Sequence, residues 1–201
     1  MRDPLGRSRV LKFKLPNHGQ ICGPQVPWMM QLSKTLIFGN SGSGKSTLAK
    51  GLAKAKGLSH LDLDSLAWLP TSPPKRAPLE DSKVRIMEFI STNSSWVIEG
   101  CYSDLLAMAI DAASEIVFLD LSVEDCIENA KNRPWEPHKY DSKEAQDKNL
   151  RMLVSWIRQY ADRVDVFSRQ AHLELYDSFQ GKKSILTSNT ATSTAAKAAA
   201  A

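Results

Sequence analysis

The stretch Gly39-Asn40-Ser41-Gly42-Ser43-Gly44-Lys45-Ser46-Thr47 decides the fold, because it matches the complete pattern GxxxxGK[ST]. It stands between an apolar run at residues 35–38, which predicts a strand, and residues 46–56, which predict a helix closed by Gly57. Glycines let successive backbone N–H groups converge on phosphate oxygens at the positive end of such a helix. The pattern assigns Lys45 to the β- and γ-phosphates and the Ser46 hydroxyl to Mg²⁺. The whole stretch is therefore a predicted nucleotide phosphate site.

Strands and helices alternate after this loop. Further strands are predicted at residues 58–63, 96–98, 116–119 and 184–187, with helices at 80–91, at 105–112, from Ser122 onward and through a long region ending near 178. The helix at 80–91 would bury Val84, Met87 and Ile90, whereas the prolines of residues 69–78 predict an exposed connection without regular structure. This alternation predicts an α/β fold, a five-stranded parallel sheet flanked by helices in the three-layer P-loop sandwich.

The length of 201 residues fits one domain. We assign residues 34–189 to a P-loop domain with a lid segment at about 132–150. Residues 1–33 are rich in Pro and Gly and predict an irregular, basic N-terminal arm. Residues 190–201 form a low-complexity, Ala/Thr-rich tail that we expect to be frayed or partly helical outside the core and to carry no chemistry.

Composition and charge narrow the class of protein. With 42% hydrophobic and 24% charged residues, the chain is not of the disordered type. The net charge of +4 arises from the basic arm, so the balanced remainder does not favour nucleic acid as a partner. No apolar run approaches a membrane span or a signal peptide, and Cys22, Cys101 and Cys126 form no CxxC pair. These features predict a cytoplasmic protein without disulfides, zinc or membrane contact, and they leave its oligomeric state open.

The phosphate loop, the stretch His60-Leu61-Asp62-Leu63-Asp64-Ser65-Leu66-Ala67-Trp68 and the stretch Ile98-Glu99-Gly100-Cys101-Tyr102 carry a family resemblance. Together they resemble the small P-loop kinases, which include adenylate, gluconate and shikimate kinases. Over roughly residues 31–190 the chain most resembles bacterial proteins described as shikimate-kinase-like or as DNA topology modulation, adenylate-kinase-related, proteins. The resemblance implies Mg²⁺-dependent transfer of the ATP γ-phosphoryl group to a hydroxyl or phosphate of a small-molecule acceptor. The missing NKxD sequence favours ATP over GTP. The alternative is a nucleotide-dependent regulatory or nucleic-acid-associated P-loop protein without a metabolite acceptor.

The same resemblance implies which residues face the acceptor. Asp62 and Asp64 correspond to the Asp-x-Asp of shikimate and gluconate kinases, so one would organise a Mg²⁺-bound water and the other, for which we favour Asp64, would orient or deprotonate an acceptor hydroxyl. If the strand still alternates there, both carboxylates point into the cleft. The alternative is that one of them caps the following helix. Trp68 would form a wall of the acceptor pocket, although packing is the other use of such a tryptophan, and Tyr102 would contact the acceptor.

Two acidic residues compete for the metal. In related kinases an acid at the end of the strand beside the P-loop strand holds a magnesium-bound water, which points to Glu99. Asp120 looks superficially like a Walker B acid, but the strand order implied by the family places it beyond the lid side. The chain has Glu99-Gly100-Cys101 where shikimate kinases carry a Gly-rich triplet, so the acceptor is not identified.

Phosphoryl transfer needs positive charge on the migrating group, and small kinases bring it on a closing lid. Arg133 in residues 132–140 is the first candidate. Arg151 and Arg158 share a face of the following helix and are second candidates, with a solvated face as the alternative. The predicted catalytic set is thus Lys45, Asp64 and Arg133.

Overall fold

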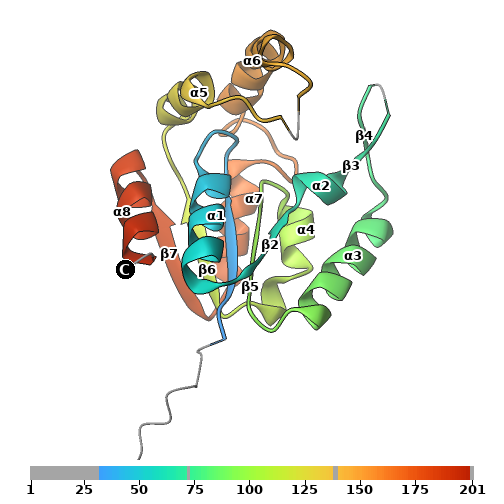
Figure 1. Cartoon of the computed structure of the whole chain (residues 1–201), viewed down its shortest axis with the longest axis vertical. Helices are drawn as coiled ribbons and strands as arrows, with labels where there is room; N and C mark the ends of the chain where they lie inside the picture. Colours follow the sequence, from blue (N-terminus) through green and yellow to red (C-terminus); the bar gives the residue numbers. More distant parts are fainter. Residues whose placement is uncertain (1–31, 72, 138–139, 200–201) are drawn as a thin grey trace, which may run out of the picture. The chain divides into compact units, whose positions relative to one another are not determined.

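The computed structural model describes residues 32–71, 73–137 and 140–199. Five parallel strands form the main sheet in the order β2-β5-β1-β6-β7, and β1 occupies its centre (Figure 1). The strands are β1 (Lys34–Gly39), β2 (Ser59–Asp62), β5 (Trp96–Gly100), β6 (Glu115–Leu119) and β7 (Lys182–Leu186). The predicted α/β fold with a five-stranded parallel sheet is confirmed.

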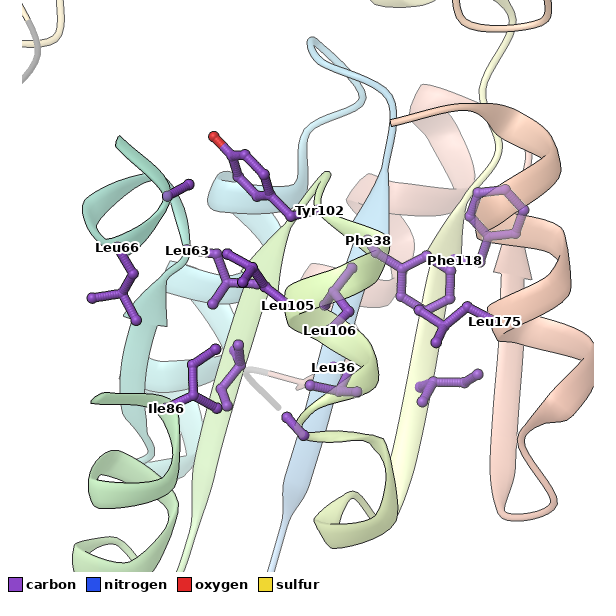
Figure 2. Close-up of a cluster of buried hydrophobic side chains, with 14 of the residues drawn as sticks. Leu36, Phe38, Leu63, Leu66, Ile86, Tyr102, Leu105, Leu106, Phe118 and Leu175 are labelled. Atoms are coloured by element: carbon purple, nitrogen blue, oxygen red, sulfur yellow. The ribbon is translucent and has the colours of Figure 1, made fainter. Parts of the chain in front are cut away.

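Helices cover both faces of this sheet. They are α1 (Lys45–Lys56), α2 (Asp64–Ala67), α3 (Leu79–Thr92), α4 (Ser103–Ala107), α5 (Val123–Asn132), α6 (Lys143–Arg158), α7 (Arg169–Ser178) and α8 (Asn189–Ala199), with a 3-10 turn η1 (Ile110–Ala112). Side chains alternate along β1, so Leu36 and Phe38 face one layer while Ile37 faces the other. The first layer consists of α2, α3, α4 and α7 (Figure 2). The second consists of α1, α5, α6 and α8.

The buried face of α3 differs from the prediction. Val84 is 62% exposed and Met87 42% exposed, whereas Ile86 and Ser82 are buried. The Ser82 hydroxyl donates a hydrogen bond to the carbonyl of Leu66 on α2, which makes a polar residue acceptable in the packed face. The hydrophobic periodicity therefore predicted the position of the helix correctly, but it predicted the wrong buried face.

Residues 69–78 were expected to lack regular structure, and this was wrong. Strand β3 (Trp68–Leu69) pairs antiparallel with β4 (Lys75–Arg76), in the register Trp68 with Arg76. Prolines cannot donate to a strand ladder, and here Pro70, Pro73 and Pro74 lie between the two short strands while Pro78 directly precedes α3. The resulting hairpin lies next to α2 in the chain.

The C-terminal half contains two further corrections. The long helical region ends at Arg158 and resumes at Arg169, where the Ser168 side chain accepts a hydrogen bond from the Ala171 N–H and caps α7. Residues 189–199 are helical, which was one of the expected alternatives for the tail, but this helix, α8, does not lie outside the core: it packs against α1 and buries Thr192. Alanine has the highest helix propensity, so an Ala-rich segment readily forms such a helix once it has a surface to pack on.

The compact unit that contains these elements begins at Leu32, and the predicted arm of residues 1–33 lies almost wholly outside the described residues. Within the described ranges, none of the helices is both long enough and apolar enough to cross a membrane.

Candidate functional site

A cavity of about 610 Å³ opens at the carboxyl ends of the parallel strands. Ligands of open α/β sheets bind at this edge, because loops from neighbouring strands converge there. The described residues that line the cavity come from several parts of the chain: the phosphate loop, the strand ends at Asp64 and Glu99–Cys101, residues between Asn129 and Glu136 together with Tyr140, Leu153 of α6, and Asn189, Thr192 and Ser193 of α8.

The phosphate loop requires its glycines. Gly42 has a φ of +79°, and a Cβ atom there would lie 2.2 Å from the carbonyl oxygen of Cys126. Gly39 has a φ of +148°, and its Cβ would lie 2.3 Å from the carbonyl oxygen of Leu119. Side chains at either position would clash with backbone, which cannot move as a side chain can. The loop is therefore wedged between β6 and α5 and leads into α1, whose first turn contains no acidic residue to offset the positive helix end.

Lys45 lies folded over this loop. Its Nζ donates a hydrogen bond of 2.8 Å to the carbonyl oxygen of Asn40, and the residue is buried. The Asn40 side chain in turn donates to the carbonyl of Ile157 at 3.2 Å, which ties the loop to the end of α6. Ser46 also lines the cavity, and Ser43 Oγ is buried without a hydrogen-bond partner among the described residues. A cation and several donors thus surround the place where the sequence predicts phosphates.

Glu99 is a buried acid at the cavity wall. It is 2% exposed, and its Oε1 has no hydrogen-bond partner in the described part of the chain, with His60 Nε2 at 3.8 Å. Its strand, β5, pairs directly with β1, in the register Ile37 with Glu99. A buried carboxylate with an orphaned oxygen, in the same cavity wall as the Ser46 hydroxyl, fits a hard cation that takes oxygen ligands.

Within the described ranges, no group of three or more His, Cys, Asp or Glu side chains could hold a metal on its own. This arrangement suits Mg²⁺, which is commonly held by one or two protein oxygens together with water and substrate phosphates.

Asp120 has a different partner. It follows the end of β6, which also pairs directly with β1, and it is not among the residues that line the cavity. Its carboxylate instead accepts two hydrogen bonds from Arg169, at 2.8 Å from Nε and 2.5 Å from Nη2. This pairing raises the pKa of Arg169 and ties the end of β6 to α7.

The two aspartates after β2 diverge. The strand ends at Asp62 and α2 begins at Asp64, so the alternation expected for Asp62 and Asp64 does not hold. Asp62 Oδ1 accepts a hydrogen bond of 2.9 Å from the Asp64 N–H, which is an Asx-turn contact just before α2. Asp64 lines the cavity, whereas Asp62 is not among its lining residues.

Trp68 and Tyr102 meet beside Asp64. The Trp68 indole N–H donates to the Tyr102 hydroxyl oxygen at 2.7 Å, and that hydroxyl donates to Asp64 Oδ1 at 2.7 Å. Tyr102 is 2% exposed, Trp68 is 38% exposed, and neither is among the residues that line the cavity. The sequence placed both at the acceptor, and the structure brings their polar atoms to one another and to Asp64.

The lid segment brings one arginine to the cavity. Arg133 lines the cavity, with Nη1 at 3.0 Å from Glu136 Oε2 and Nη2 donating to the Tyr140 hydroxyl at 3.4 Å. Arg151 and Arg158 are exposed on α6 and do not line the cavity. The predicted segment 132–150 comprises the end of α5, a connection and the first half of α6.

The family model AAA_18, described as an AAA domain, matches residues 36–151. The chain belongs to this AAA domain family. No curated protein matches the sequence significantly.

Among solved structures, the AAA domain resembles a gluconokinase from Sinorhizobium meliloti 1021, at 14% identity and a TM-score of 0.50, over 84% of this chain and 91% of that one. A shikimate kinase from Bacteroides thetaiotaomicron gives 13% identity and a TM-score of 0.49 over 83% and 95% of the two chains. A shikimate kinase from Acinetobacter baumannii gives 18% identity and a TM-score of 0.46, over 83% of this chain and 90% of that one. At such identity the gluconokinase likeness shows the fold alone. The predicted resemblance to small P-loop kinases is thus confirmed at the level of the fold.

Several residues that shape the site were missed by the sequence analysis. Arg76 on β4 places its guanidinium carbon 4.9 Å from the Tyr102 ring centre and 5.4 Å from that of Phe167, and its Nη2 donates to Asp104 Oδ2 at 2.9 Å. Thr192 and its neighbours on α8 were assigned no chemistry because low-complexity composition carries no motif. No local signal in either stretch points to the cavity.

The cysteines of the AAA domain are poor nucleophiles. Burial raises the pKa of the Cys101 thiol to about 12 and that of Cys126 to about 11. Both thiols therefore stay protonated at neutral pH.

Proposed function

We propose that this protein is a Mg²⁺-dependent phosphotransferase that moves the γ-phosphoryl group of ATP to a hydroxyl or phosphate of a small metabolite. The observation that carries the proposal is that Asp64 and the phosphate loop line the same cavity. A protein that only binds nucleotide has no need of a carboxylate on the acceptor side. A kinase needs one to orient or deprotonate the group that attacks phosphorus.

The donor side would hold the triphosphate. Backbone N–H groups of the loop and the end of α1 would bind phosphate oxygens, and Lys45 would exchange the Asn40 carbonyl for the β- and γ-phosphates. Ser46 and Glu99 would hold Mg²⁺, which when bound neutralises charge on the phosphates. Arg133 would release its contacts with Glu136 and Tyr140 and bind the migrating phosphoryl group instead.

In the transfer step, an oxygen of the acceptor forms a bond to the γ-phosphorus while the bond between that phosphorus and the bridging oxygen of ADP breaks. The proton of an acceptor hydroxyl passes to the Asp64 carboxylate, and ADP leaves. No covalent enzyme intermediate is required, so alignment and charge stabilisation supply the rate enhancement.

The test is ATP consumption with Mg²⁺ across a panel of hydroxylated metabolites and nucleoside monophosphates. We expect strong stimulation by one compound, its loss in Lys45→Ala, and its retention in Lys50→Ala, which removes an exposed lysine of the same helix. Tight ATP binding without stimulation by any compound would instead support the regulatory alternative. Consumption that is independent of every acceptor would indicate a simple ATPase.

A further inference from the structure

We infer that Tyr102 and Trp68 are positioning residues, which hold the Asp64 carboxylate in one orientation through an ordered chain of hydrogen bonds from Trp68 to Tyr102 to Asp64. This inference rests on the proposed function, because it concerns how Asp64 is presented to an acceptor. It differs from the role predicted for the two aromatic residues, which was direct contact with the acceptor.

The direction of the chain follows from the chemistry of the three groups. An indole N–H can only donate, so the Tyr102 oxygen accepts from Trp68 at 2.7 Å. An ionised carboxylate can only accept, so the Tyr102 O–H donates to Asp64 Oδ1 at 2.7 Å. The indole thus polarises the hydroxyl and makes it a stronger donor. A carboxylate has about four acceptor positions, so the Tyr102 bond is compatible with an acceptor hydroxyl on the same group.

The Tyr102 ring is held on several sides. The Phe167 ring lies edge-on at 5.3 Å, and the Arg76 guanidinium lies 4.9 Å from the ring centre, itself paired with Asp104. Figure 2 shows Tyr102 at the edge of the apolar cluster with its hydroxyl directed away from the other labelled side chains. A buried ring in such contacts has one position, so the hydroxyl oxygen is a fixed point rather than a mobile one.

The backbone around Asp64 is held against the same ring. The Leu63 N–H donates to the Glu99 carbonyl at 2.9 Å, and a Cβ on Gly100 would lie 2.9 Å from Leu63 Cβ and 3.2 Å from Tyr102 Cδ2. Gly100 therefore allows the end of β5 to approach the residue before Asp64 closely. Backbone and hydroxyl together fix both ends of the Asp64 side chain.

The chain of hydrogen bonds from Trp68 to Asp64 affects the reaction rate, because a reacting group must lie in a near-attack position and a small misplacement slows the reaction. Trp68 belongs to the β3–β4 hairpin and Tyr102 to the connection after β5, so two separate parts of the fold hold one carboxylate. Loss of the Tyr102 hydroxyl would leave Asp64 able to accept a proton but would remove one of the contacts that orient its carboxylate.

The experiment compares Tyr102→Phe, which removes one oxygen and keeps the ring, with Tyr176→Phe, which does the same on α7. We expect kcat to fall roughly 10- to 100-fold in Tyr102→Phe, with KM for ATP changed less than about 2-fold. Trp68→Phe keeps the hydroxyl and loses only its polarisation, so we expect a smaller fall of about 3- to 10-fold. Tyr176→Phe should leave kcat and KM unchanged, since its ring contact with Lys183 remains.

A double-mutant cycle separates positioning from general damage. In an Asp64→Asn background, Tyr102→Phe should change kcat by less than about 2-fold, because the group that it positions no longer acts. Thermal unfolding of each variant checks that the fold is retained. An unchanged kcat in folded Tyr102→Phe, or an equal loss in both backgrounds, would overturn the inference.

A second readout does not depend on activity. The indole N–H resonance of Trp68, identified by its loss in Trp68→Phe, should shift and exchange with solvent faster in Tyr102→Phe. An unchanged resonance would show that the chain of hydrogen bonds does not exist in solution. If the wild-type protein transfers phosphate to no acceptor, the proposed function fails and the positioning role fails with it, while the resonance still decides whether the chain forms.

Discussion

The two ends of the cavity are built differently. The donor end is one continuous stretch, Gly39 to Thr47, whose groups for phosphate are mostly backbone N–H groups and one lysine. The acceptor end is an assembly in which Asp64 on α2 meets Tyr102 after β5 and Trp68 on β3. Under the proposed function, the nucleotide would be bound mainly by the local backbone geometry of one stretch. The acceptor would be bound by side chains that only the fold brings together.

The strongest test of the donor end is Gly42→Ala. A Cβ there meets the Cys126 carbonyl at 2.2 Å in a backbone conformation with φ of +79°, so the loop must deform. We expect ATP affinity to fall by roughly 100- to 1000-fold, because several phosphate contacts depend on the loop geometry. Titration calorimetry with ATP measures this loss. Gly51→Ala is the matched control, since a Cβ in that part of α1 meets nothing within 4 Å.

The corresponding test of the acceptor end is Asp64→Asn. We expect kcat to fall by roughly 100-fold, as for loss of a general base, while ATP affinity changes less than about 2-fold. Steady-state kinetics and titration calorimetry measure the two quantities on one preparation. Asp111→Asn, in the turn before β6, should leave both unchanged. A parallel loss of ATP affinity in Asp64→Asn would mean that the two ends are not separable.

Arg133 of the lid segment should affect phosphoryl transfer more than ATP binding. Arg133→Gln removes the guanidinium that lines the cavity, and we expect kcat to fall about 10-fold or more. Arg151→Gln changes an exposed arginine of α6 and should alter kcat by less than about 2-fold. Both variants are measured with saturating ATP. An equal effect in Arg151→Gln would show that α6 moves to bring that residue to the phosphates.

The smallest effect that we expect at neutral pH comes from His172, a buried residue that contacts Cys101 behind the acceptor end of the cavity. His172 is buried between Tyr160 Oη, at 2.7 Å from Nδ1, and the Cys101 carbonyl, at 3.1 Å from Nε2. A carbonyl only accepts, so Nε2 carries the proton and the Tyr160 hydroxyl donates to Nδ1. Both hydrogen bonds suit the neutral ring, and burial lowers the pKa of His172 to about 4 from an ordinary value of 6.5.

Because the folded pKa lies below the unfolded value, the unfolded chain binds more protons between these two values. The free energy of unfolding therefore falls as the pH drops from about 6.5 to about 4, by at most about 3 kcal/mol from this residue. Urea unfolding at pH 7, 6 and 5 should show a shallower pH dependence in His172→Gln than in the wild type. Tyr160→Phe keeps the histidine and should retain the dependence; identical slopes in all three proteins would contradict the prediction.

Much of the site could be predicted because it consists of residue types placed at strand ends. Glu99, Asp64 and Arg133 were named from the sequence, and the structure brings all three to one cavity. The Ser122 cap of α5 was predicted as well and is confirmed by its hydrogen bond from the Asp125 N–H. Such features depend on a few neighbouring residues, so they can be recognised from the sequence alone.

The features that could not be predicted depend on which helices and strands pack against one another in the folded protein. The Arg169 partner of Asp120 lies 49 positions away in the sequence. Val84 was expected to be buried, although α3 turns Ile86 and Ser82 inward. The C-terminal segment was expected to be frayed or partly helical outside the core, because composition says nothing of the α1 surface on which α8 packs.

The sequence by itself determined the phosphate loop, its strand and helix, and hence the layered α/β fold. Consecutive residues adopt those structures through backbone geometry and periodic burial, and no distant partner is needed. Only the tertiary structure decided that Trp68 and Tyr102, 34 positions apart, would form one hydrogen-bonded chain on Asp64. A hydrogen bond between side chains requires both atoms within about 3 Å in a favourable direction, and that distance is set by the packing of the sheet, α2 and the hairpin rather than by spacing in the chain.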